Sequence, residues 1–223
     1  SVLLQAKHSE NMYFRSDRGL NRTAGMLNHL PAFANQHTYA LAAIYPYATQ
    51  MDGEWAMQGE IRYLFARRTA MGGRYGTTLK LNASHVRGLA DRWLASSSSY
   101  YTDVNVELNK KISQRWQLNA MLMYQGYNAT VIEGHGGYWH NGIAVLDAKF
   151  VATRRIQMRV ETQYLYSRQG EGQRFFALYE QSMTLPHDHN LMISLQDQYV
   201  IGHGQSSAEQ GENYYSFQAA WQY

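Results

Sequence analysis

Histidines lie next to carboxylate or hydroxyl side chains at several places in the chain, and each of these groupings has a chemistry to consider. His187 and His189 flank Asp188, so that both imidazoles project from one face of an extended segment, as two metal ligands would. No third ligand is evident near them, and the segment follows Pro186 in an expected turn. A solvated turn is the preferred interpretation, and the sequence predicts no metal site.

The sequence gives little indication of a serine–histidine pair in which the histidine would activate the serine as a nucleophile. Ser84 precedes His85 directly, but neighbouring residues on a strand point to opposite faces and cannot pair. His203 lies near Ser206 and Ser207 without a Gly-x-Ser-x-Gly turn. We therefore expect no catalytic residue and no cofactor, and an enzyme with its site at the rim of a barrel is the least favoured alternative.

Two expected loops carry aromatic and histidine side chains that are suited to binding. His135 and His140 flank a Gly-Gly-Tyr-Trp stretch that ends in Trp139, and Trp93 lies in a second expected loop. Binding residues are often carried on loops that a rigid scaffold positions. The external-loop binding candidates are therefore Trp93, His135, Trp139 and His140, although a flexible loop with the aromatic ring at a membrane surface is the preferred interpretation.

The elements that position these residues alternate apolar and polar side chains with a period of two, which predicts β-strands. Ile156, Met158 and Val160 lie on one face of such a segment, and Gln157 and Arg159 lie on the other. The expected strands cover residues 36–46, 53–66, 74–85, 99–110, 114–125, 140–151, 155–167, 172–183, 189–201 and 212–223, with a further strand expected at 1–8.

The length of these strands separates the chain from an ordinary soluble sandwich. Eleven residues tilted near 45° rise about 25 Å, the height of the apolar band of an outer-membrane barrel. No run of about eighteen apolar residues is present, so a transmembrane helix is not expected. The predicted fold is all-β, a single antiparallel up-and-down transmembrane β-barrel over residues 1–223 with about 10–12 long strands. A soluble lipocalin-like barrel is the second choice.

The polar faces of these strands are expected to point into the barrel, because a charge that faces lipid costs about 2–4 kcal/mol at the midplane. The predicted lumen-lining residues are Glu60, Arg62, Lys80, Asn105, Glu107, Lys149, Arg159, Glu161 and Gln163. A narrow barrel would join them in salt bridges, whereas a wider one would leave them hydrated along a channel. The favoured function is a pore or transport-type channel for small solutes. The alternative is a structural or partner-binding barrel subunit of an envelope complex.

Loop lengths predict the orientation, because barrels have short periplasmic turns and longer external loops. Counting back from a periplasmic C-terminus places tight turns near 152–154 and 111–113 inside, and long loops near 87–98 and 126–139 outside. The segment 9–35 interrupts this scheme; an inward plug, a short helix or periplasmic element, and a missed hairpin all remain open. The basic residues in the periplasmic turns are either solvated or form a docking ring for an acidic partner.

The last residues resemble the assembly signal of outer-membrane barrels. Phe217, Trp221 and Tyr223 share one face, and the terminal residue is aromatic. The expected partners are therefore outer-membrane lipid and the barrel assembly machinery. The net charge is +3, too low to indicate nucleic acid, and the absence of cysteine excludes disulfides and thiolate metal sites.

Three stretches resemble a family of uncharacterised Bacteroidota outer-membrane proteins. These are residues 36–50, Gly59-Glu60-Ile61 and Gly73-Arg74-Tyr75-Gly76-Thr77, and the stretch from Met12 to Arg18 fits the same family. The resemblance is clearest over about residues 9–80. It implies a location in the outer membrane of a Gram-negative bacterium and a larger barrel of which this chain would be the C-terminal half. It implies no activity and no catalytic residues.

Overall fold

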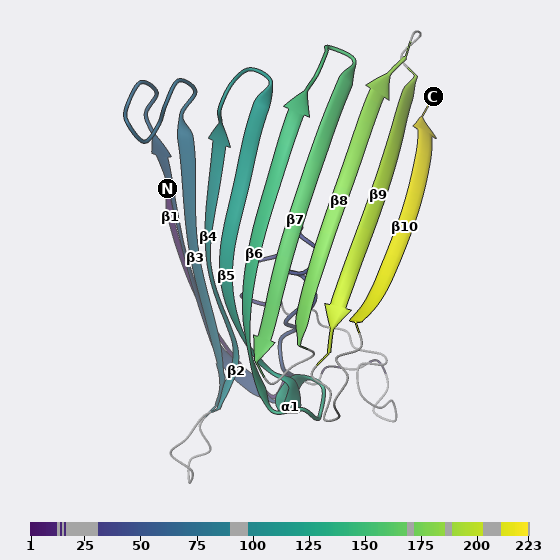
Figure 1. Cartoon of the computed structure of the whole chain (residues 1–223). Coiled ribbons are helices and arrows are strands. Elements are labelled where there is room, and N and C mark those ends of the chain that lie inside the picture. Colours follow the sequence, from purple (N-terminus) through teal and green to yellow (C-terminus); the bar gives the residue numbers. More distant parts are fainter. Residues whose placement is uncertain are drawn as a thin grey trace.

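The computed structural model of the chain is one antiparallel β-sheet of ten strands that lie in sequence order (Figure 1). It describes residues 1–12, 14, 16, 31–89, 98–168, 172–185, 189–202 and 211–222. The strands are β1 (Val2–Glu10), β2 (Gly53–Phe65), β3 (Thr77–Gly88), β4 (Ser99–Lys111), β5 (Trp116–Asn128), β6 (Tyr138–Val151), β7 (Ile156–Arg168), β8 (Gln173–Thr184), β9 (Asn190–Ile201) and β10 (Gly211–Gln222). One short helix, α1 (Ala129–Ile132), follows β5.

Among the residues that the structure describes, none of the helical segments has the length and apolar character of a transmembrane helix.

The strand register keeps each side-chain face continuous across the sheet, because directly paired residues point the same way. One row of paired residues contains Arg62, Lys80, Glu107, Met121, Val145, Gln163, Phe176 and Gln198. The adjacent row contains Tyr63, Leu79, Leu108, Ala120, Leu146, Thr162 and Ala177. We name the face of the first row the inner face and that of the second the outer face.

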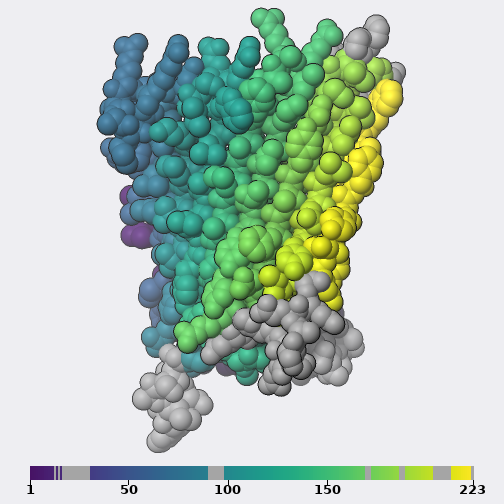
Figure 2. Space-filling view, in the orientation of Figure 1, coloured from purple at the N-terminus to yellow at the C-terminus, as the bar shows by residue number. Residues whose placement is uncertain are grey.

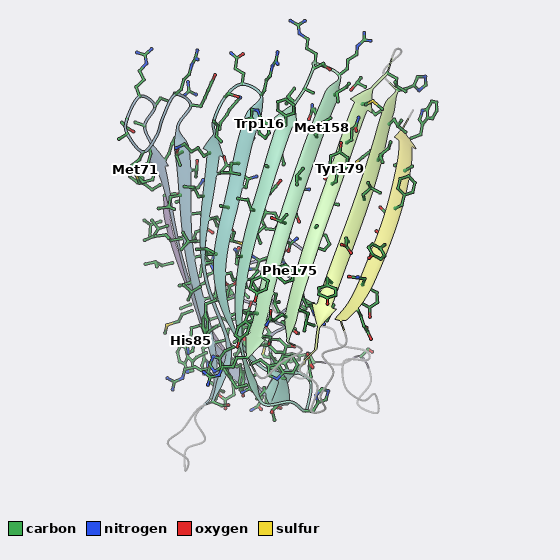
Figure 3. The ribbon with its side chains drawn as sticks, viewed as in Figure 1. Met71, His85, Trp116, Met158, Phe175 and Tyr179 are labelled. Atoms are coloured by element: carbon green, nitrogen blue, oxygen red, sulfur yellow. The ribbon has the colours of Figure 1, made fainter. Side chains whose placement is uncertain are left out.

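The outer face is apolar and exposed to the surroundings of the molecule. Leu122 is 66% exposed and Val160 49%, although both lie in the middle of long strands. Figure 3 views this face and labels Trp116, Phe175 and Tyr179 among its side chains. In the space-filling view of the same face, none of the described elements covers the strands (Figure 2). An apolar surface of this extent is not left facing water in an ordinary soluble protein.

The connections differ in length at the two ends of the sheet. At one end, the short-turn end, residues 112–115 and 152–155 join neighbouring strands by tight turns, and the longer connection 66–76 joins β2 to β3. The Ser113 hydroxyl accepts from the backbone N–H of Trp116 at 3.0 Å, and Thr153 Oγ1 accepts from that of Ile156 at 3.1 Å. The other end, the loop end, holds α1 and the long connection from β1 to β2 (Figure 1). The predicted tight turns near 111–113 and 152–154 are confirmed.

The N-terminal part of the chain corrects one predicted element and confirms another. The strand predicted at 1–8 is present as β1, whereas the strand predicted at 36–46 is wrong. Residues 39–45 form turns instead, in which the backbone N–H of Ala43 donates to the Tyr39 carbonyl at 3.0 Å. Most of the segment 9–35 lies outside the described residues.

The sheet is open. β1 and β10 form its two edges, and no pairing between them occurs in the part of the chain that is described. Side chains 212–221 on β10 are exposed on both faces. The antiparallel up-and-down sheet of the predicted fold is therefore present, but its closure into a barrel is not.

Candidate functional site

The inner face carries a folded segment of the chain itself. Residues 31–52, which we name the docked segment, leave the loop end after β1 and lie behind the sheet in the view of Figure 1 before β2 begins. Leu41 and Ala42 are each 1% exposed, and they belong to one core cluster with inner-face residues such as Met123 and Val145. Full burial of a leucine-sized side chain contributes about 1.5–3 kcal/mol. The segment is therefore a packed element rather than a solvated loop.

Aromatic rings fix the docked segment near the loop end. The Tyr45 ring lies 5.3 Å from the Tyr127 ring and 5.4 Å from the Trp139 ring. The Tyr47 ring stacks on the Tyr101 ring at 5.2 Å. Pairs of this geometry contribute about 0.5–1.5 kcal/mol each beyond their buried area.

Side-chain amides of the sheet satisfy the backbone of the docked segment. Gln163 Oε1 accepts from the backbone N–H of Leu41 at 2.8 Å, and Gln125 Nε2 donates to the Tyr45 carbonyl at 3.1 Å. Asn141 Nδ2 in turn donates to Gln125 Oε1 at 3.1 Å. A buried loop has no neighbouring strand to pair with, so these amides supply the hydrogen bonds that its main chain requires.

A buried ion pair holds the segment at its start and at its end. Lys7 Nζ lies 2.7 Å from Glu54 Oε1, and it donates to the Pro31 carbonyl at 2.9 Å and to Thr49 Oγ1 at 2.7 Å. Glu54 is fully buried and also accepts from the Tyr47 hydroxyl. Burial, followed by the nearby Glu54 carboxylate, raises the pKa of Tyr47, so its hydroxyl remains a donor.

The turn of the docked segment contacts two buried carboxylates on the sheet. His37 Nε2 lies 2.7 Å from Asp103 Oδ2, and Asn105 Nδ2 donates to Asp103 Oδ1 at 2.8 Å. The Tyr39 hydroxyl donates to Asp147 Oδ2 at 3.4 Å. Burial raises the pKa of Tyr39 to about 12, with the Asp147 carboxylate as the next cause. Tyr39 therefore donates as a neutral phenol at physiological pH.

Asp147 belongs to a charged cluster around one arginine. The Arg159 guanidinium contacts Asp147 at 3.0 Å, Glu180 at 3.1 Å and Glu161. Gln163 Nε2 also donates to Glu161. Three carboxylates share one cation, which gives this part of the inner face an excess of negative charge.

A second charged cluster lies on β2, β3 and β4. Lys80 Nζ lies 3.5 Å from Glu60 and 3.6 Å from Glu107. Arg62 is paired with Lys80 in the register, and within the described ranges no acid lies in ion-pair distance of its guanidinium. Lys149 is likewise paired with Arg159 in the strand register, so two basic residues lie side by side there as well.

All nine predicted lumen-lining residues lie on this one face of the sheet, because the register places each of them in a row with the others. The structure groups most of them into the two charged clusters, while Asn105 joins the contact with Asp103.

Two cavities flank the turn of the docked segment. The first, of about 580 Å³, lies among residues of the segment and Tyr101. The second, of about 510 Å³, lies between the segment and strands β2 to β5, where Arg62, Lys80 and Glu107 line it. His37 lines both cavities, so the contact between His37 and Asp103 lies at the division between them.

The predicted loop residues are not gathered into one site. Trp139 is 8% exposed on the inner face, where its Nε1 donates to the Gly136 carbonyl at 2.9 Å. His140 lies on the outer face, and its Nδ1 is 2.7 Å from the Tyr124 hydroxyl. His135 is exposed in the turn after α1. Trp93 lies outside the described residues.

The aromatic residues proposed as an assembly signal lie on the outer face of the edge strand. Phe217 is 65% exposed and Trp221 68% exposed, while Tyr223 lies outside the described residues. The assembly role itself stays a prediction. The described ranges hold no group of three or more histidine, aspartate or glutamate side chains that is arranged to bind a metal ion.

Sequence reasoning missed the residues that bind the docked segment. Glu54, Asp103, Gln125 and Asp147 were not among the predicted inner residues, although the same alternation places each of them on the polar face of its strand. The alternation therefore indicated that these side chains point to the inner face. No local pattern indicated that a segment of the chain would cover them.

Comparisons with known proteins identify a family and nothing more specific. Neither the curated proteins nor the solved structures gave a match. A family model described as a family of unknown function, DUF6029, matches residues 1–223. The chain therefore belongs to the DUF6029 family.

Proposed function

We propose that the chain forms the wall of an outer-membrane β-barrel whose lumen passes small polar solutes and is narrowed by the docked segment. The observation that carries this proposal is the contrast between the two faces of the sheet. One face is apolar and exposed along strands of twelve to fourteen residues, and the other holds charged clusters and a folded segment. The family resemblance seen in the sequence favours a Gram-negative, Bacteroidota outer membrane.

The outer face suits lipid because hydrocarbon requires neither hydrogen bonds nor charge from it. The mid-strand side chains are aliphatic or aromatic, as at Leu122, Leu146 and Val160. Asp197 is a carboxylate on this face, and it lies four residues before the loop end of β9. Because β9 has twelve residues, Asp197 lies near the middle of the strand, where a carboxylate that faces lipid is destabilising, although by less than the about 2–4 kcal/mol of a basic residue at the midplane.

Closure is compatible with the strand directions. The sheet has ten strands that alternate in direction, so its first and last strands run antiparallel to each other. β1 and β10 can therefore form an antiparallel seam, either with each other or with further strands between them. An open pair of edges would leave unpaired backbone groups in hydrocarbon, where each costs several kcal/mol.

The inner face supports a narrowed pathway rather than a wide one. The docked segment fills the middle of the face with apolar packing, while cavities of about 580 and 510 Å³ remain on either side of its turn. The charged residues Arg62, Lys80 and Glu107 line the second cavity. A solute that passes must cross the division at His37 and Asp103, so we expect small conductance and strong dependence on the docking of the segment.

A partner-binding barrel is the second candidate, and the basic turns favour it. Arg67, Arg68, Arg154 and Arg155 are exposed at the short-turn end. This end would face the periplasm in the orientation that the loop lengths predict. An acidic envelope protein is the partner that such a surface would attract.

Single-channel recording from the purified chain in a planar bilayer tests the pore, after heat-modifiable gel mobility has shown that the barrel is folded. We expect small, stable current steps whose ion selectivity changes in Glu107→Gln, because this residue lines the second cavity. Asp197→Asn is the matched control, since it removes the same charge from the outer face. A folded protein that gives no current, with the docked segment either intact or loosened by substitution, contradicts the pore and leaves the partner-binding barrel.

A further inference from the structure

A groove of about 460 Å³ crosses the outer face of strands β1 to β4 near one edge of the sheet. Small residues form the floor of the depression at Ala6, Gly59 and Ala83, which lie on three neighbouring strands, and the Leu4 side chain packs against Gly59 at one side. Leu4, Met57 and Val104 supply larger apolar side chains around it. The groove is therefore a mainly apolar depression that spans several strands.

The end of the groove nearest the loop end is basic. His85 lines it, with Nδ1 2.9 Å from the Thr102 hydroxyl, and Figure 3 labels this residue near the loop end of the outer face. The next row of paired residues towards that end is His8, Trp55 and Arg87. Two residues along a strand span about 7 Å, so Arg87 and His85 can contact one small anion.

Arg87 has the features of a side chain that is available to a ligand. It is exposed, and within the described ranges it has no acid in ion-pair distance. The strand register also shifts between Val86 and Arg87, where the pairing with β4 is irregular. Such irregularities redirect side chains at the ends of sheets.

We infer that this groove binds a phosphate-bearing anionic lipid, with one acyl chain along Ala83 and Gly59 and the phosphate at Arg87 and His85. The inference rests on the proposed membrane location but not on a pore. Apolar lining joined to a basic end matches a lipid in both of its parts, because guanidinium groups form paired hydrogen bonds with phosphate oxygens. Neither a free anion nor an uncharged apolar molecule would use both parts of the groove.

A second basic position on the same face provides the comparison. Arg168 is paired with His140 near the loop end, and the Tyr124 and Tyr138 rings lie beside His140. Here rings occupy the surface, and the groove of strands β1 to β4 does not extend to this cation. Arg168 is therefore a matched control for a positive charge away from the groove.

Native mass spectrometry of the full chain in detergent, titrated with phosphatidylglycerol, tests the inference. We expect saturable binding of one lipid that is about ten-fold weaker in Arg87→Gln and unchanged in Arg168→Gln, since one charge-assisted contact is worth about that factor. Ala83→Trp fills the groove and should abolish binding, whereas Ala144→Trp, on the same face of β6, should not.

Three outcomes would overturn the lipid site. The first is equal weakening by Arg87→Gln and Arg168→Gln, which would indicate general attraction of charge. The second is full competition by inorganic phosphate, which would indicate an anion site without an acyl chain. The third is equal binding of phosphatidylcholine. Gel mobility reports whether each variant is folded. If Ala83→Trp does not fold, the comparison of Arg87→Gln with Arg168→Gln still tests the site. Because binding is read in detergent, a loss of conductance alone leaves this result unaffected.

Discussion

Replacement of Leu41 by alanine should release the docked segment without unfolding the sheet. The side chain is 1% exposed within the core cluster, while its hydrogen bond to Gln163 involves only the backbone N–H and survives the change. Leucine-to-alanine changes in cores cost about 2–5 kcal/mol, and a turn that can relax lies at the lower end, about 2–3 kcal/mol. At about 1.4 kcal/mol for each factor of ten, the undocked fraction rises about 30- to 150-fold.

A single cysteine can report this fraction, because the chain contains no cysteine of its own. Ala42→Cys places a thiol at a position that is 1% exposed when the segment is docked. Its rate of labelling by a water-soluble maleimide follows the undocked fraction when opening and closing are faster than the reaction. We expect the labelling rate to rise by the same factor in the Leu41→Ala background, and the channel current to rise with it.

The control is Leu81→Ala, which removes a leucine of the outer face that is 40% exposed. It should leave the labelling rate at residue 42 unchanged. If Leu41→Ala labels no faster than this control while both proteins remain folded, the packing of the docked segment does not hold it in place, and the reasoning fails.

Three further predictions concern the charged and phenolic contacts of the inner face. Glu54→Gln should lower the free energy of unfolding by about 3–5 kcal/mol in urea titrations, because it leaves the buried Lys7 ammonium without its acid. Arg159→Gln should lower the free energy of unfolding by up to about 3 kcal/mol at neutral pH, because it leaves three carboxylates without their shared cation, which is itself partly exposed. The pKa of Tyr39 is raised in the folded protein, so its contribution to docking should be complete below about pH 10 and lost as the pH rises through about 12. The labelling rate of the cysteine at residue 42 should therefore increase over this pH range. In Tyr39→Phe, this increase with pH should be smaller.

The sheet could be predicted from the sequence because its cause is local. Alternation with a period of two locates the strands and assigns Lys80 or Arg159 to one face, and the short gaps between alternating segments predict tight turns and antiparallel neighbours. Few folds other than a transmembrane barrel are compatible with long strands that each carry one apolar face. The strand at 1–8 followed in the same way from an alternating stretch.

The docked segment could not be predicted, because its cause is tertiary. Tyr39, Leu41, Tyr45 and Tyr47 repeat every two or four residues, which reads as a strand, yet these residues bend through turns and pack on a curved face. What holds them are partners far along the chain, such as Gln163 for Leu41. No periodicity records contacts of that kind.

Labels on the two faces of β5 can show directly that one side of the sheet faces lipid and that the docked segment covers the other. Spin labels placed singly along residues 117–126 in lipid vesicles would be tested for contact with oxygen, which enters lipid, and with a water-soluble nickel complex. We predict that oxygen contact alternates with a period of two, high at Leu122 and Tyr124, and that Met121 and Met123 are shielded from both reagents. Contact of the nickel complex with Leu122 and Tyr124, or the absence of alternation, would contradict the account.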